Sequence, residues 1–198
     1  GETLAMAFLG TFFGGVLAFG LSFLAARNTA PNLTWRAGGR VFLALQRVAP
    51  DYAIMMVILI VVGFGPFAGT LALVIGSTGM FGKFFADTIE NLEPEPTDGV
   101  RVLGGSRTQV FRYGIVPRVL PSFVANGFFL LEMNMAGAIA LGAFGGGGLG
   151  FHLNVAYDTL NYQDMLAYVF FIVLVMMLIE RASDHWRRRI FAEGGTLK

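Results

Sequence analysis

One acidic residue within an otherwise apolar stretch is the first feature of this sequence that could do chemistry. Glu132 lies in the run 119–142, with the amides Asn126 and Asn134 on either side of it. An ionisable group inside a membrane-length apolar run is costly unless it faces a partner or water. We therefore predict that Asn126, Glu132 and Asn134 line a translocation pathway, and the alternative is a structural pair or a hydrogen bond to a neighbouring helix.

Other catalytic and metal-binding patterns are sparse. His152 and His185 are predicted on opposite sides of the membrane, and neither H-E-x-x-H nor G-x-S-x-G occurs. His152 with Asp158 and Asp164 could form an outer metal site, although ordinary polar loop residues are the simpler interpretation. An intramembrane enzyme built around Glu132 remains an alternative, but we expect a transporter without enzymatic activity of its own.

A glycine-rich segment matches a nucleotide-binding motif by spacing alone. Gly145, Gly147 and Gly150 satisfy G-x-G-x-x-G. That fingerprint requires a preceding strand in a soluble βαβ unit, whereas this segment follows an apolar run, so we reject nucleotide binding there. The phosphate-binding pattern G-x-x-x-x-G-K-[ST] does not occur. We therefore expect no cofactor in this chain, and ATP and Mg would be held by a partner.

The composition indicates the elements that must position these residues. The chain of 198 residues is 55% hydrophobic and 14% charged, against about 25% charged residues in soluble domains. A membrane span needs roughly 20 apolar residues, and five runs approach this length: 3–26, 48–64, 66–86, 119–142 and 165–180. We predict an all-α integral membrane protein, a polytopic helical bundle of about five transmembrane helices in a single domain, 1–198.

The basic residues predict the orientation of the bundle. All 14 lysines and arginines follow the first, third and fifth runs or lie at the end of the third. By the positive-inside rule, segments 27–47 and 93–118 and the C-terminus are cytoplasmic and the N-terminus is outside. The run Arg187–Arg189 is then a topology anchor. The chain has no cysteine, which excludes disulfides and thiolate metal sites.

Local patterns predict contacts between and within these helices. Gly10-x-x-x-Gly14 could let another helix approach closely. Residues 35–47 are expected to form a short helix at the membrane interface. Asp87 and Glu90 follow Lys83 by four and seven residues on one helical face, which predicts a local ion pair. The chain starts Gly1-Glu2 and enters a span almost at once, as is typical of a fragment or a processed chain, and no signal peptide is visible.

The polar segment 93–117 has the pattern of a docking element. Prolines at its start and Gly104-Gly105 in its middle delimit one short helix. Ser106 and Gln109 have the spacing of a capping box, which predicts the start of a second helix. Two short helices held at the cytoplasmic face can present one apolar edge to a groove on a soluble partner.

The same segment is similar to the cytoplasmic loop of permease subunits of ATP-binding-cassette importers. In that loop, E-A-A-x-x-x-G is followed by I-x-L-P, with the Gly six and the Pro nineteen residues after the Glu. Asp98, Gly104 and Pro117 have this spacing here. Asp replaces Glu, Gly99-Val100 replace Ala-Ala, and Gly and Val replace the Ile and Leu of the second motif.

Further segments resemble the phosphonate-type branch of this family, which is the binding-protein-dependent, MetI-like type I superfamily. They are 23–28 (FLAARN), 65–73 (GPFAGTLAL), 82–83 (GK), 112–121 (RYGIVPRVLP) and the glycine-rich end of the fourth run. The resemblance covers nearly the whole chain. The branch often shows an Arg soon after the membrane Glu and Asn, where residues 132–136 here read EMNMA, and this departure leaves the exact cargo open.

The resemblance implies a function and a set of partners. The chain would be the permease of an importer in the bacterial inner membrane, working as a homodimer with a cytoplasmic ATPase dimer and an outer substrate-binding protein. Its cargo would be a phosphonate or a related phosphorus oxyanion, and no nucleic-acid partner is expected. The residues that would contact the ATPase are Asp98, Gly99, Val100, Arg101, Leu103, Gly104, Ser106 and Arg107.

Two alternatives to this function remain. The chain could be an importer permease of the same architecture for another small solute, such as an amino acid. It could also be a channel or secondary transporter that needs no ATPase, and in that case a bulky residue in place of Gly104 would leave transport intact.

Overall fold

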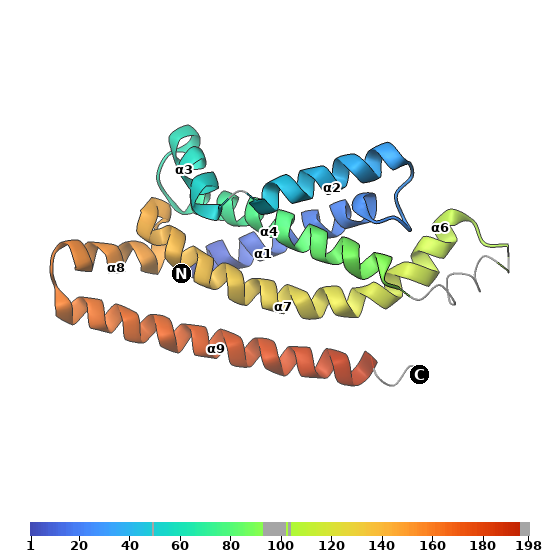
Figure 1. Cartoon of the computed structure of the whole chain (residues 1–198). Helices are drawn as coiled ribbons and strands as arrows, with labels where there is room; N and C mark the ends of the chain where they lie inside the picture. The colour runs from blue at the N-terminus through green and yellow to red at the C-terminus, as the bar shows by residue number, and fades with distance from the viewer. Residues whose placement is uncertain (49, 93–101, 103, 195–198) are drawn as a thin grey trace.

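The computed structural model describes residues 1–48, 50–92, 102 and 104–194 (Figure 1). All regular structure in these residues is helical. The α-helices are α1 (Glu2–Ala25), α2 (Leu33–Val48), α3 (Asp51–Val62), α4 (Pro66–Glu90), α6 (Arg107–Gln109), α7 (Val116–Leu141), α8 (Gly148–Asp158) and α9 (Tyr162–Gly194), and the π-helices are η1 (Val110–Ile115) and η2 (Gly142–Gly146).

Four helical stretches of the described chain are long and apolar enough to cross a membrane. They are Glu2–Ala25, Pro66–Glu90, Val110–Gly146 and Tyr162–Ile190. The predicted all-α membrane fold is therefore confirmed. The remaining predicted run, 48–64, instead holds the 12-residue α3, whose length of about 18 Å is too short for a hydrocarbon core of about 30 Å.

Proline explains why this run is divided. Pro50 lies between α2 and α3 with an extended backbone (φ −64°, ψ 134°), and it has no N–H to continue the hydrogen-bond pattern of α2. The predicted short helix 35–47 is present as the longer α2. This helix lies alongside α4 (Figure 1) and buries Leu43 in the bundle.

Close packing of α1 on α4 forms the centre of the bundle. A Cβ atom added at Gly10 would lie 2.8 Å from Leu73 Cβ, and one added at Gly14 would lie 2.7 Å from Ser77 Cβ. Both distances are shorter than side chains tolerate. The predicted role of Gly10-x-x-x-Gly14 is confirmed, because the absence of side chains here lets the two helices approach.

Two buried apolar clusters occupy opposite ends of this helix pair. One includes Ala25, Phe85 and Phe123, with the last two rings 4.1 Å apart between centroids. The other includes Met6 and Leu141. Each cluster joins α1, α4 and α7, so these three helices form the core on which the others pack.

Helix α9 lies at one edge of the bundle, next to α7 and α8 (Figure 1). No residue in its most apolar 18-residue stretch is buried by the rest of the chain. Exposed apolar surface of this length is what a lipid-facing helix presents.

The glycine-rich segment makes the turn between α7 and α8. Gly145 and Gly147 have φ of +103° and +80°, and a Cβ at Gly150 would overlap the carbonyl of Ile139. The first residues of α1 cap α8: the Gly148 N–H donates to Glu2 Oε2 (2.9 Å) and the Leu149 N–H donates to Thr3 Oγ1 (2.8 Å). A carboxylate at a helix N-terminus is favourable, so this segment has a structural role.

Candidate functional site

The predicted docking segment is described only in its second half. Asp98, Gly99, Val100, Arg101 and Leu103 lie outside the described residues, as does the side chain of Arg107. Gly104 is exposed and has a φ of +80°. That conformation suits glycine and few other residues.

The predicted capping box begins the second short helix. The Ser106 N–H donates to Gln109 Oε1 (2.8 Å), and the Gln109 N–H donates to Ser106 Oγ (3.4 Å). The helix that starts here does not end before the next span. Instead α6 continues through η1 directly into α7, so the second half of the docking segment is continuous with a membrane-length helix.

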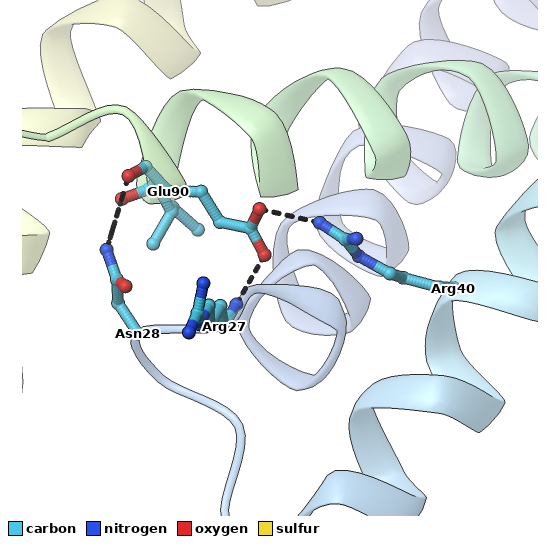
Figure 2. Close-up of polar contacts among 5 residues, drawn as sticks. Arg27, Asn28, Arg40 and Glu90 are labelled. Carbon is cyan, nitrogen blue, oxygen red and sulfur yellow. Dashed lines mark hydrogen bonds and ion pairs between the residues drawn. The ribbon is translucent and has the colours of Figure 1, made fainter.

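Glu90 lies at the end of α4, just before the docking segment, and joins three elements (Figure 2). Its Oε1 accepts a hydrogen bond from the Arg27 N–H (2.5 Å), and its Oε2 pairs with Arg40 Nη2 (2.6 Å). The Asn28 amide donates to the carbonyls of Ile89 (3.2 Å) and Glu90 (3.4 Å). Asn28 thereby satisfies carbonyl groups that the end of a helix leaves free.

These contacts correct one prediction. Glu90 does not pair with Lys83 of its own helix but with Arg40 of α2. Lys83 and Asp87 are exposed, and their side chains make no ion pair among the described residues.

The turn that Glu90 and Asn28 hold also faces the docking segment. Residues 28–31 form one wall of a cavity of about 470 Å³, and Gly105, Val110, Phe111 and Ile115 form the other. The ring of Phe111 in η1 lies edge-on to Phe23 of α1, with 4.7 Å between centroids. The end of α1 and the turn after it thus contact both the α4 residues just before the docking segment and the second half of the segment itself.

Asn134 ties the three core helices together. It is 5% exposed. Ser77 Oγ donates to its Oδ1 (2.9 Å), and its Nδ2 donates to Thr11 Oγ1 (3.0 Å). Asn134 and Ser77 also line a cavity of about 350 Å³ beside Gln46 and Pro50, at the junction of α2 and α3.

Glu132 has an ionic partner on α9. Arg187 Nη2 donates to Glu132 Oε1 (2.9 Å) and to Asp184 Oδ1 (2.8 Å). The side chains of Glu132 and Arg187 are 18% and 27% exposed. The arginine interpreted from sequence as a topology anchor is therefore also the partner of the membrane glutamate.

The three predicted pathway residues do not converge. Asn126 Nδ2 donates to the Ser122 carbonyl of its own helix (2.7 Å), Asn134 faces α1 and α4, and Glu132 faces α9. The outer residues considered for a metal site also remain apart, because the described part of the chain holds no group of three potential metal ligands. There His152 stacks on Tyr168 at 5.9 Å between ring centroids.

Comparison with known proteins identifies related sequences. Residues 18–191 match the model of a family described as the binding-protein-dependent transport system inner membrane component. The phosphite transport system permease protein PtxC of Stutzerimonas stutzeri is 34% identical over 187 residues, which is 94% of this chain and 68% of PtxC. The phosphate-import permease protein PhnE of Mycolicibacterium smegmatis is 34% identical over 191 residues, which is 96% of this chain and 36% of PhnE.

The fold has a counterpart among solved structures. An inward-facing structure of the MetNI methionine ABC transporter contains a chain that aligns with a TM-score of 0.81 at 22% identity, covering 96% of this chain and 93% of that one. The likeness extends the family match to the arrangement of the helices. The chain spans about two thirds of the length of PtxC and about a third of that of PhnE.

Proposed function

The chain belongs to the family of binding-protein-dependent transport system inner membrane components, and from this premise we propose that it is the permease subunit of an ATP-binding-cassette importer. The family match over residues 18–191 is the observation that carries the proposal. The four membrane-length helices and the likeness to a transporter chain agree with it.

The cargo that the relatives favour is a small phosphorus oxyanion. PtxC and PhnE are named for phosphite and phosphate transport, and the sequence itself resembles phosphonate-type permeases. The methionine transporter shares the fold at 22% identity, so it gives no support to an amino acid cargo. We therefore propose import of a phosphonate, phosphite or related phosphorus oxyanion, delivered by an outer binding protein.

Energy for transport would come from an ATPase dimer at the cytoplasmic end, where the docking segment 93–117 is expected to bind. Helix α6, η1 and α7 follow one another without a break from Arg107 to Leu141, so a displacement at the docking segment would be passed along α7. Two copies of the chain, related by a two-fold axis, could then rock between inward- and outward-open states, as in other domain closures. Asn126, Glu132 and Asn134 remain proposed pathway residues, and the cavity at Asn134 supports this role for that residue.

Co-purification tests the docking assignment. The permease would be isolated from its native membrane together with its ATPase, and Asp98→Lys and Arg101→Glu are each expected to release the ATPase. Gly104→Leu is expected to do the same, because the positive φ of Gly104 strains a branched side chain. Gly20→Leu is a matched control, since no atom lies within 4 Å of a Cβ at that position. Retention of the ATPase by all three docking variants would contradict the assignment.

Transport tests the cargo. The assembled complex in proteoliposomes, supplied with its binding protein, should take up labelled phosphite or methylphosphonate only when ATP is present. Uptake of an amino acid in their place would overturn the cargo, and uptake that needs no ATP would overturn the importer assignment itself.

A further inference from the structure

The two oxygens of the Glu90 carboxylate serve two different elements. One accepts from the backbone at the end of α1, and the other pairs with a side chain of α2 (Figure 2). Both are charge-assisted interactions, which are roughly twice as strong as neutral hydrogen bonds. A single side chain at the end of α4 thus holds the end of α1 and the middle of α2.

The contacts of Glu90 with Arg27 and Arg40, together called the Glu90 junction, are important for where they lie and not for how much they stabilise the fold. The side chains of Glu90 and Arg40 are 21% and 43% exposed, and an exposed ion pair contributes little to stability. However, α4 ends at Glu90, only a few residues before the expected docking segment. A movement of the docking segment would therefore act first on the end of α4, where the Glu90 junction lies.

The far side of the docking segment contacts the same turn. Residues 28–31 form a cavity wall opposite Phe111 and Ile115 of η1, and Phe111 packs on Phe23. Glu90 lies just before the segment, and Phe111 and Ile115, near the end of the segment, face the α1–α2 turn that Glu90 holds. The α4 residue before the segment and the last described part of the segment therefore contact the same turn.

We propose that Glu90 is a positioning residue that makes α2 and the cytoplasmic ends of α1 and α4 move as one body when the docking segment moves. This inference rests on the proposed importer function. Without the Glu90 contacts, the last turn of α4 could shift with the docking segment relative to the end of α1 and to α2. ATP hydrolysis would then continue with less solute moved for each ATP.

The test measures ATP hydrolysis and solute uptake by the assembled complex in proteoliposomes. Glu90→Gln keeps the size of the side chain but has one acceptor oxygen and no charge, so it cannot serve Arg27 and Arg40 together. The expected result is normal assembly, continued ATP hydrolysis and a roughly tenfold fall in solute moved per ATP, a typical size for a coupling effect.

Three further substitutions show whether a change in the ratio comes from the Glu90 contacts. Arg40→Gln should give a smaller loss of coupling, because the Arg27 contact survives, and Arg40→Lys should restore much of it. Asp87→Asn is the matched control: this acid is exposed, lies three residues before Glu90, and has no side-chain partner among the described residues. It should leave the ratio unchanged.

The outcomes separate the inference from the proposed function. An unchanged ratio of uptake to hydrolysis in an assembled Glu90→Gln complex would overturn the inference alone. If the Glu90→Gln complex does not assemble, the Arg40→Gln and Arg40→Lys complexes provide the test. Equal ratios of uptake to hydrolysis in these two complexes would overturn the inference. A merely structural role would lower the unfolding temperature and the yield but leave the ratio as it was. Wild-type protein without ATP-driven uptake would overturn the proposed function and the inference with it.

Discussion

Asn126 and Asn134 are the same residue type on one helix, but they make different contacts. Asn134 bonds to side chains on α1 and α4, whereas Asn126 bonds within its own turn. Asn134→Leu would leave the buried hydroxyl of Ser77 without its acceptor, whereas Thr11 would keep its hydrogen bond to the Ala7 carbonyl. We expect this change to lower the free energy of unfolding by about 1–3 kcal/mol.

Thermal unfolding in detergent, followed by tryptophan fluorescence, measures this difference. Asn126→Leu serves as the control on the same helix, and its shift should be clearly smaller. Equal shifts for the two variants would show that the contacts between helices contribute nothing beyond the local ones.

Two carboxylates share the guanidinium of Arg187. Either Glu132 or Asp184 alone can balance its charge, whereas removing both leaves a half-buried cation without an acidic partner. We expect Glu132→Gln and Asp184→Asn to be mild individually and their combination to cost about 0.5–3 kcal/mol more than the sum. Chemical denaturation of the four proteins of this cycle gives the value, and strict additivity would contradict the shared pairing.

The sequence indicated which charged residues need an ion-pair partner, but it did not indicate which residue the partner is. Glu132 stood out because a carboxylate in an apolar run requires compensation. Its partner lies 55 positions away, and no local spacing indicates which face of α9 meets α7. The same limit explains the wrong partner for Glu90: helical spacing favoured Lys83, while the fold brought Arg40 closer.

Alanine substitutions at two glycines of α1 are expected to change the stability of the protein in opposite directions. Alanine is about 1 kcal/mol better than glycine within a helix, so Gly20→Ala, with no atom within 4 Å of the added Cβ, should be neutral or stabilising. Gly14→Ala would place its Cβ 2.7 Å from Ser77 Cβ, and the resulting separation of α1 from α4 should cost about 1–3 kcal/mol.

Unfolding temperatures of these two variants, compared with the wild type, check the sign of each effect. An unchanged temperature for Gly14→Ala would contradict the close approach of the two helices, and a lower one for Gly20→Ala would contradict the open space at that position.

The positions of the membrane-length helices were the most predictable part of the fold, because the thickness of the membrane sets the number of apolar residues that each needs. The separation of a short helix from the run that follows it near Pro50 was also expected. The 12-residue length of α3 was not, because hydropathy reports which solvent a segment prefers and not where its helix ends. Helix α2 was expected at the membrane surface because of its basic residues, but Leu43 packs against Gly82 of α4 and draws the helix along the bundle.

The whole molecule has two ends that should lie on opposite sides of the membrane. The α1–α2 turn and the end of α4 lie at one end, and the α8–α9 turn lies at the other (Figure 1). These 198 residues contain no cysteine, so a cysteine introduced among them is the only one that they carry. A membrane-impermeant maleimide should label Asp158→Cys in intact cells, and Asn32→Cys only after permeabilisation.

The cysteine-free wild type is the control for this experiment and should not be labelled. The reverse pattern would place the basic segments outside, contrary to the positive-inside rule, and would move the docking segment away from any cytoplasmic ATPase.

The π-helix η1 lies between the docking segment and the membrane helix α7. A π turn bonds each residue to the fifth one along and so contains more residues than an α turn. If η1 rewound as α-helix, the surplus residue would turn α7 by about 100° and shift it by about 1.5 Å relative to α6. A change of η1 from π-helix to α-helix would therefore couple a small shift of α7 along its axis to a rotation of α7. That rotation would change which face of α7 packs against the neighbouring helices.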